Sequence, residues 1–431
     1  MQRRPKSIHL SEAERAALRA LLRDGVNPTH AARRLGCDPR TARKEAKALR
    51  RQDQADAPPS PVPPPAPPEA STVSPEQERA ERLGAEFWRR KAKLAEASLA
   101  RVEHLAGELA GLRGQSWQVP DWLLTPPGAG ERGRSVVGCL VSDVHMGEVI
   151  EPDEILGVNR FDPEACRARL RRYFDAACTI GRRWASDTQC EGALLVLGGD
   201  MVSGAIHDEL AATNALTSPE QVVAVVEAIA GGIRMLAEAY GRVHVVSVPG
   251  NHGRTTPKPT AKLYARLSYD IMVAAMLQER FRHDERLSFQ HGDSKDQIVP
   301  VFGRTVFVTH GDKIGTKGGM GFAGPMLPIV RGTKKVEAQQ ARFGRRPDLI
   351  LHGHYHTTGN AGAVLSNGSV PGYGEYADDL RAEPEPPQQW LFLLHSKWGL
   401  RERAPIQLEP PGLPPKPRVR VPAGWQGGEA A

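Results

Sequence analysis

The feature that most constrains the fold is a set of five short apolar, β-branched runs, each followed closely by Asp, His or Asn. Such runs are typical of buried strands, and helix-length segments separate them. The runs are residues 136–141, 193–197, 243–248, 305–308 and 349–351. Because ligands of α/β sheets gather at the carboxyl ends of the strands, we expect the polar residues to meet at that edge. The pattern predicts an α/β protein with its functional site there.

The residues that follow the runs carry oxygen and nitrogen donors. They are Asp143, His145, Asp200, Asn251, His252, His310, His354 and His356. A donor set of carboxylate, amide and imidazole without thiolate suits Mn, Fe, Zn or Ni. The candidate ligands exceed what one ion needs, whereas a bridging carboxylate would let them serve two ions about 3.5–4 Å apart. The sequence therefore predicts one divalent metal ion, or two if a carboxylate bridges them, with Mn²⁺ as the first expectation.

The ordered series DxH, GD, GNH, H and GHxH resembles the calcineurin-like metallophosphoesterase superfamily. It occupies residues 143–145, 199–200, 250–252, 310 and 353–356, and the resemblance covers roughly residues 135–400. The flanking text is similar to phosphoesterases of phage and prophage genomes, in GGDMVSGAIHDEL (198–210), GNHGR (250–254), NGS (367–369) and GYGEYA (372–377). The resemblance implies a four-layer α-β-β-α metallophosphoesterase sandwich over residues 135–402.

The resemblance also implies a role for each motif residue. Asp143, His145 and His356 would bind one metal ion. Asn251, His310 and His354 would bind the other, and Asp200 would bridge the two. A hydroxide formed on the metals would attack phosphorus, because coordination lowers the pKa of water. His252 would meet the phosphoryl oxygen or the leaving group, as a general acid or an electrostatic stabiliser.

One departure from the family pattern concerns the residue after the GNH histidine. The family usually has Asp or Glu there, whereas this chain has Gly253 followed by Arg254. The histidine would then need another partner to orient it. Arg254 would either clamp a substrate phosphate or be an ordinary surface charge. His207, which follows the expected bridging aspartate by seven residues, is a further candidate for the substrate pocket.

Basic residues concentrate at the N-terminus. Residues 1–51 hold 14 Lys and Arg against five Asp and Glu. The net charge of this segment is therefore higher than the +7 of the whole chain. Three helix starts are predicted: one at Ser11 with Glu14, one at Pro28, and one at Asp38 with Pro39. The last of these helices is rich in Arg and Lys. This layout is that of a helix-turn-helix domain whose last helix enters the major groove of DNA. The alternative is a soluble three-helix bundle whose charges only solvate it.

The remaining segments have other compositions and are interpreted one by one. Residues 52–73 are predicted to be a Pro-rich linker, and residues 74–113 a long helix that either packs on the next domain or forms a coiled-coil homodimer. Residues 311–335, rich in Gly and Lys, are expected to be either a mobile loop that attracts a polyanion or an ordinary insertion. Residues 403–431 are predicted to be a Pro-rich, basic, disordered tail.

The five cysteines are scattered without a CxxC pair, and no apolar segment is long enough for a signal peptide or a membrane span. We therefore expect a cytoplasmic protein without a disulfide framework and without a membrane partner.

Taken together, the patterns predict a metal-dependent phosphoesterase, in the first instance a phosphodiesterase or nuclease that residues 1–51 direct to DNA. One alternative is a phosphomonoesterase or protein phosphatase that its helix-turn-helix only localises. Another is a DNA-binding regulator with an inactive hydrolase domain.

Overall fold

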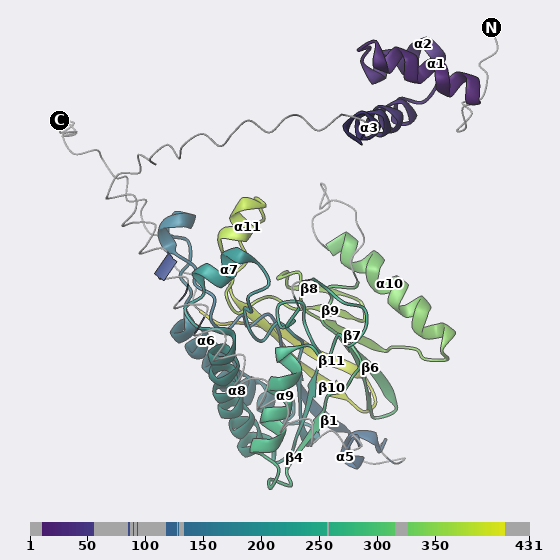
Figure 1. Cartoon of the computed structure of the whole chain (residues 1–431). Coiled ribbons are helices and arrows are strands. Elements are labelled where there is room, and N and C mark those ends of the chain that lie inside the picture. The colour runs from purple at the N-terminus through teal and green to yellow at the C-terminus, as the bar shows by residue number, and fades with distance from the viewer. Residues whose placement is uncertain are drawn as a thin grey trace, which may run out of the picture. The chain divides into compact units, whose positions relative to one another are not determined.

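The computed structural model describes residues 11–55, 118–126, 128, 133–256, 258–314 and 326–409, together with residues 85, 86, 89 and 93. The chain divides into two compact units, residues 1–82 and 83–431 (Figure 1). In its described residues the first unit holds three helices, and the second is a mixed α/β protein with two sheets.

The first unit consists of α1 (Glu12–Arg23), α2 (Pro28–Leu35) and α3 (Pro39–Ala55). Helix α1 begins at Ser11, whose side chain accepts the backbone N–H of Glu14 in a capping box. Helix α2 ends at Gly36, which takes the left-handed conformation that a residue with a Cβ rarely adopts. The helices bury a small core of Leu18, Ala31, Ala32 and Ala42. Helix α3 continues past the predicted domain boundary at residue 51.

The second unit contains a six-stranded sheet of order β11-β10-β1-β2-β3-β4. Its strands are β1 (Arg134–Val141), β2 (Gln189–Leu197), β3 (Val243–Ser247), β4 (Leu287–Gln290), β10 (Gln388–His395) and β11 (Gly399–Gln407). Strands β1 to β4 run parallel, while β10 is antiparallel to both β1 and β11. The carboxyl ends of β1, β2 and β3 therefore lie at one edge.

Helices α6 (Pro163–Trp184), α8 (Ser218–Tyr240) and α9 (Tyr269–Arg280) pack with one face of this sheet in a single apolar core (Figure 1). Asp162 caps α6 by accepting two backbone N–H groups, and Thr217 with Glu220 forms a capping box for α8. These caps satisfy backbone donors that the first turn of a helix leaves unpaired. They fix where each helix starts after the loop that precedes it.

A second sheet, of five strands in the order β5-β6-β7-β9-β8, packs against the other face of the first. Its strands are β5 (Asp296–Val301), β6 (Arg304–Thr309), β7 (Leu349–His352), β8 (Gly359–Ala361) and β9 (Val364–Ser366). Leu194 and Val246 from the first sheet share a core with Val306 and Leu351 from the second. Helix α10 (Met326–Arg342) buries Ile329 against the far face of the second sheet.

Four shorter helices complete the described part of the second unit, and they connect strands or flank the site. They are α5 (Asp121–Leu124), the 3-10 helix η2 (Pro152–Ile155), α7 (Asp208–Thr213) and α11 (Glu375–Asp379).

The five strands predicted from the sequence are present as β1, β2, β3, β6 and β7, but they belong to two sheets. Their carboxyl ends therefore meet where two sheet edges come together, and not at the edge of one sheet. The predicted start of the disordered tail at residue 403 falls inside β11, whose residues pair with β10 as far as Gln407. Backbone pairing, which polar residues can also make, holds this strand in the sheet.

Several predicted segments lie outside the described residues. These are residues 56–73 of the linker, residues 410–431 of the tail, residues 315–325 of the Gly- and Lys-rich stretch, and the segment 74–113 apart from four isolated helical positions. The possible homodimer through residues 74–113 stays a prediction. Among the described helices, none has the length and apolarity that crossing a membrane would require.

Candidate metal centre

The candidate ligands lie in the loops that follow five strands, and most share an unusual backbone conformation. Among the described non-glycine residues, few have a positive φ. Five of them are candidate ligands: Asp143 (51°), His145 (47°), Asp200 (53°), His354 (74°) and His356 (51°). A side chain with a Cβ is strained in this left-handed region, and such strain concentrates at functional sites. Each turn directs the side chain of a residue that follows a strand into the space that the loops share.

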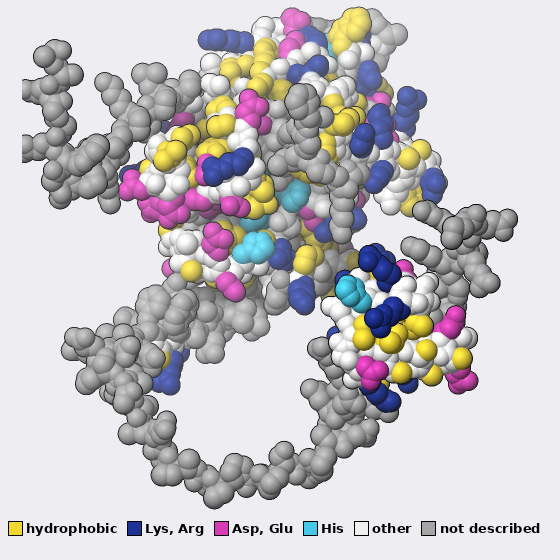
Figure 2. Space-filling model, turned by 90° about the horizontal axis from the view of Figure 1, so that it is seen from above, with side chains coloured by type: hydrophobic (Ala, Val, Ile, Leu, Met, Phe, Trp, Pro, Cys, Tyr) yellow, Lys and Arg dark blue, Asp and Glu magenta, His cyan; other side chains and the backbone are white. Residues whose placement is uncertain are grey.

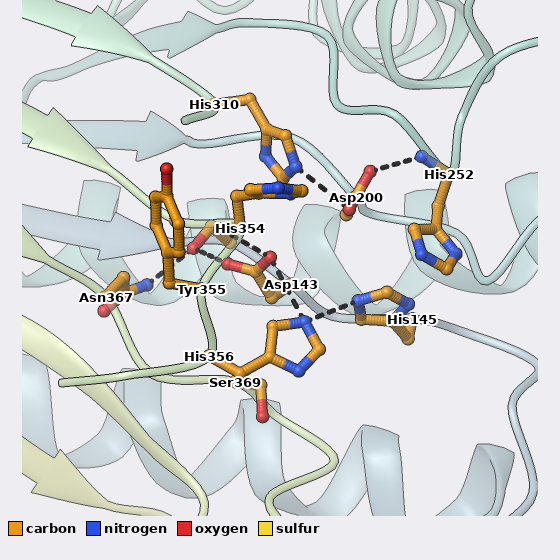
Figure 3. A network of polar contacts seen from close by, with 12 residues as sticks. Asp143, His145, Asp200, His252, His310, His354, Tyr355, His356, Asn367 and Ser369 are labelled. Carbon is orange, nitrogen blue, oxygen red and sulfur yellow. Dashed lines mark hydrogen bonds and ion pairs between the residues drawn. The ribbon is translucent and has the colours of Figure 1, made fainter. Parts of the chain in front are cut away.

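One group of side chains comprises Asp143, His145 and His356, whose ligand atoms all lie within 4.8 Å of one another. Nε2 of His145 is 3.1 Å from Nε2 of His356, and the latter atom is 3.5 Å from Oδ1 of Asp143 (Figure 3). Two imidazole nitrogens and a carboxylate oxygen that face the same point are a fitting set of ligands for a divalent ion.

The Asp143 carboxylate is held from behind by polar contacts. Its Oδ1 accepts the backbone N–H of His354 at 2.9 Å, and its Oδ2 accepts the hydroxyl of Ser142. Asn367, from the NGS segment, donates to the same hydroxyl at 2.9 Å and to Gln389 at 2.7 Å. These groups fix the orientation of the carboxylate before any ligand arrives.

A second group comprises Asp200, His310 and His354. Nε2 of His310 lies 3.0 Å from Oδ2 of Asp200 and 3.1 Å from Oδ1 of Asn251. Nδ1 of His310 donates to the carbonyl of Gly198 at 2.9 Å, which leaves Nε2 as the atom that can ligate a metal. The structure thus brings all seven sequence-predicted ligands to one place.

Asp200 belongs to the second group and also to a third, with His145 and His252. Figure 3 shows it between His310 and His252, and its Oδ1 accepts the backbone N–H of His252 at 2.7 Å. It is fully buried, which opposes ionisation. The neighbouring His310 and His252 outweigh this effect and hold the pKa of Asp200 well below its usual range. A shared, ionised carboxylate at the centre of imidazoles suits a position between two cations.

The imidazoles differ in protonation. Burial lowers the pKa of His145 well below its usual value and that of His354 to about 4, so both rings are neutral near pH 7. For His310, burial also opposes the charge, but the Asp200 carboxylate raises its pKa to about 10. A divalent ion would replace that proton, since a metal binds the neutral ring. These buried carboxylate and imidazole groups fit one or more divalent metal ions.

His252 has an orienting partner although the residue that follows it is glycine and not an acid. Its Nδ1 lies 2.9 Å from the carbonyl of Ser203, to which it donates, and its ring centroid is 4.5 Å from that of His145. Burial lowers the pKa of His252. The carbonyl fixes the tautomer and leaves Nε2 as the atom that can exchange a proton.

The two predicted substrate-binding residues lie outside the three groups. The Arg254 guanidinium donates to the carbonyl of Asn251 at 2.9 Å and to that of Thr256 at 3.2 Å, so it braces the loop that carries Asn251. His207 is exposed and precedes the first turn of α7. Arg254 thus contacts only the backbone carbonyl of the candidate ligand Asn251, and among the described residues the structure shows no contact between the His207 side chain and a candidate ligand.

Two acidic residues near the site were not found from the sequence. Glu148 Oε2 lies 3.4 Å from Nδ1 of His145, and burial raises the pKa of Glu148 to about 7. Asp270, in the first turn of α9, is fully buried beside Asp200, and burial raises its pKa to about 6. Asp270 had no usable signal, because an acidic residue in the first turn of a helix is ordinary. Glu148 follows the DxH motif closely and could have been found by its spacing.

Comparisons with known proteins add little to this geometry. No family model matches the sequence, and no curated protein matches it significantly. Among solved structures, the phosphopantetheinyl hydrolase (PptH) from Mycobacterium tuberculosis is similar at 12% identity and a TM-score of 0.24. The alignment covers 59% of this chain and 94% of that one. A TM-score this low does not establish a shared fold.

Proposed function

We propose that the second unit is a metal-dependent phosphoesterase with a dinuclear centre of the calcineurin-like type. The sequence motifs support this proposal, as does the packing of helices, two sheets and a further helix around three apolar cores. In the proposed fold these layers form the four-layer α-β-β-α sandwich of that superfamily.

The observation that carries the proposal is the position of Asp200. Asp200 belongs to two of the three groups: one with His310 and His354, and one with His145 and His252. His145 belongs in turn to the group that contains Asp143. Three overlapping groups with one shared carboxylate suit two ions, and not one. When bound, divalent ions such as Mn²⁺ would supply Lewis acidity toward a phosphoryl oxygen and would lower the pKa of water.

The protein's own residues would then have separate tasks. Asp143, His145 and His356 would hold one ion, and Asn251, His310 and His354 the other, with Asp200 between them. His252 would face the phosphoryl group and move or hold a proton at Nε2, since its Nδ1 is engaged by Ser203. Arg254 would keep the Asn251 loop in place and leave the contact with substrate to other groups.

The test is hydrolysis of a bis-aryl phosphodiester and of a mono-aryl phosphate by the metal-free protein before and after addition of Mn²⁺. We expect Mn²⁺-dependent hydrolysis that falls to background in Asp200→Asn and His310→Gln. His244→Gln is the matched control, because His244 is a buried histidine outside the three groups. Unchanged rates in Asp200→Asn would contradict the proposal, and a strong preference for the monoester would exclude a nuclease.

We also infer that the first unit binds DNA and that the physiological substrate is nucleic acid. On α3, Arg40, Arg43, Lys44 and Lys47 are exposed, and Figure 2 shows Lys and Arg side chains standing out from the surface of this unit. The one acidic residue of that part of α3, Glu45, is paired with Arg15 and Arg19 of α1, at 3.2 and 2.9 Å. The exposed side chains of this part of α3 are therefore mainly cationic, as phosphate binding requires.

The five cysteines are all free thiols, which favours a reducing compartment such as the cytoplasm.

A further inference from the structure

Asp270 is a buried carboxylate that none of the metallophosphoesterase motifs contains. Its side chain is fully buried in the first turn of α9, which begins at Tyr269 and is capped by Ser268. Its own backbone N–H is satisfied by the hydroxyl of Ser268 at 3.2 Å. Its carboxylate lies beside the backbone of Asp200 and Met201.

The Asp270 carboxylate accepts three backbone N–H groups from two different loops. Its Oδ1 accepts Met201 at 2.9 Å, and its Oδ2 accepts Asp200 at 3.3 Å. The same Oδ2 accepts Gly250 at 2.7 Å. The first two donors belong to the loop after β2, and the third belongs to the loop after β3, next to Asn251. One side chain thus joins the two loops that carry the central carboxylate and the GNH residues.

The glycine that departs from the family pattern borders the same carboxylate. A Cβ added at Gly253 would lie 2.5 Å from Oδ2 of Asp270 and 2.8 Å from its Cγ, which is closer than real Cβ atoms approach. Asp270 is short and held by three hydrogen bonds, so it has little freedom to move aside. Glycine at position 253 and aspartate at position 270 are therefore coupled: the space that the missing side chain leaves is filled by a carboxylate from α9.

We propose that Asp270 is a positioning residue of the metal centre. It holds the loops after β2 and β3 in register so that Asp200 and Asn251 present their oxygens to the same ion, a task that requires Gly253 beside it. This inference rests on the proposed metal-dependent function and assigns to α9 a part in it. Groups that orient metal ligands in this way raise metal affinity about 10–100-fold.

The first experiment measures Mn²⁺ binding to the metal-free whole chain by calorimetry, with thermal melting of the same samples. Asp270→Asn keeps the shape but turns an NH₂ group toward at least one backbone N–H. We expect it to weaken Mn²⁺ binding about 10–100-fold. Glu191→Gln is the matched control, because Glu191 is also buried and accepts hydrogen bonds from Arg134 and Arg242 but lies at the start of β2. It should lower the melting temperature without changing Mn²⁺ affinity.

The second experiment is a double-mutant cycle with Gly253→Ala and Asp270→Ala. Alone, Gly253→Ala should displace the carboxylate and weaken Mn²⁺ binding. In the Asp270→Ala background the added methyl group has room, so the double variant should bind Mn²⁺ no more weakly than Asp270→Ala. Equal losses from Gly253→Ala in both backgrounds would overturn the coupling.

The outcomes separate this inference from the proposed function. Unchanged Mn²⁺ affinity in folded Asp270→Asn overturns the positioning role, whatever the enzyme does. If the wild-type chain binds Mn²⁺ without hydrolysing any phosphoester, and Asp270→Asn binds it more weakly, the proposed function fails while the positioning role stands. If Asp270→Ala does not fold, Asp270→Asn and Gly253→Ala still decide the matter.

Discussion

At the scale of single residues, His252 is held in two ways that do not depend on each other. Its backbone N–H contacts Asp200, while its ring is fixed through Nδ1 by the carbonyl of Ser203. A side-chain substitution at position 252 therefore leaves the contact with the central carboxylate in place. The role of the ring can be measured separately from metal binding.

We expect His252→Gln to lower kcat toward a phosphodiester by about 10²–10⁴-fold, the usual contribution of a general acid, with little change in Mn²⁺ affinity. Rates should be measured with a p-nitrophenyl and an unsubstituted phenyl leaving group. A proton donor to the leaving group matters more for the poorer one, so the phenyl ester should lose more. Equal losses would assign His252 to a non-bridging oxygen, and an unchanged kcat would exclude a catalytic role.

The sequence was informative for residues that follow strands and uninformative for those that act through the backbone. The candidate ligands were found because their types and their spacing after apolar runs are unusual. The sequence leaves open whether Arg254 clamps a phosphate or is a surface charge, and it does not indicate that Arg254 donates to the carbonyls of Asn251 and Thr256. Asp270 binds N–H groups, which every residue except proline has, so no pattern of side chains marks its partners.

At the scale of elements, Arg169 of α6 connects segments that are far apart in the sequence. Its buried guanidinium donates to the carbonyls of Val370 at 3.0 Å and Pro371 at 2.8 Å, and to Oδ1 of Asn159 at 2.9 Å. It also pairs with Glu409 at 2.6 Å. Val370 in turn donates to the carbonyl of Asp143, so α6 supports the loop behind the candidate metal centre.

Replacement of Arg169 with Met would remove the guanidinium that donates to the Val370 carbonyl and to Asn159, whereas the Pro371 carbonyl would keep a second donor in the side-chain amide of Asn159. We expect a loss of about 3–5 kcal/mol in the free energy of unfolding of the α/β unit, measured by urea denaturation. Lysine should not rescue it, because it lacks the forked donor geometry. Glu409→Gln is the control and should cost under about 1 kcal/mol, since Glu409 is half-exposed. A small effect of Arg169→Met would show that water or neighbouring groups replace the guanidinium.

His244 of β3 has polar contacts with the neighbouring strand β4. Its ring nitrogens lie 2.8 Å from the hydroxyl of Ser288 and 3.3 Å from the side-chain oxygen of Gln290. Burial lowers its pKa to about 4. Between the unfolded value of about 6.5 and the folded value, the unfolded chain binds a proton that the folded one does not. This residue's contribution to stability is therefore complete above about pH 6.5 and falls as the pH drops toward 4.

We expect His244→Gln to show a smaller loss of stability between pH 7 and pH 5 than the wild type. Melting temperatures of the two proteins over that range, without added metal, provide the measurement. Because other histidines titrate in the same window, only the difference between the two curves is diagnostic. Parallel curves would mean that His244 is not the source of the acid sensitivity.

The strands found from the sequence all contain continuous apolar runs, whereas the three helices of the first unit were found from their capping residues. Strands β8 and β9 are three residues long, and β11 reads GLRERAPIQ, so neither apolar alternation nor length marks them. The division of the strands between two sheets could not be derived from the runs alone, since all five have the same texture. The family resemblance supplied that expectation, and the residues themselves did not.

At the scale of the whole molecule, the exposed cations of the first unit are the feature that bears on its proposed DNA binding. The cations of the first unit that face solvent on α3 are available to phosphate, whereas its acidic Glu45 is paired internally. If the first unit binds the DNA backbone, affinity should fall steeply as salt rises, because binding to phosphates releases counterions.

The combined substitution of Arg43, Lys44 and Lys47 by Gln should weaken DNA binding. It should also reduce the slope of log K against log salt by about 0.9 for each phosphate that the variant no longer neutralises. Hydrolysis of a small aryl phosphodiester should not change. Substitution of Arg171, Arg182 and Arg183 of α6 by Gln, which removes the same charge from exposed positions of the second unit, is the control. Equal effects of the two sets would assign binding to overall charge and not to α3.

The left-handed backbone of the candidate ligands implies a conflict between stability and function. Residues such as His356 carry a penalty of about 1–2 kcal/mol in this conformation, which glycine would avoid. The His356 side chain is 40% exposed and lies 3.5 Å from the buried Asp143 carboxylate, so His356→Gly should remove a ligand and this pair, and thermal melting of the metal-free protein should show that relief of the backbone strain offsets part of the loss. A sequence selected for stability alone would favour glycine at these five strained positions, so we expect the side chains retained there to serve the proposed function.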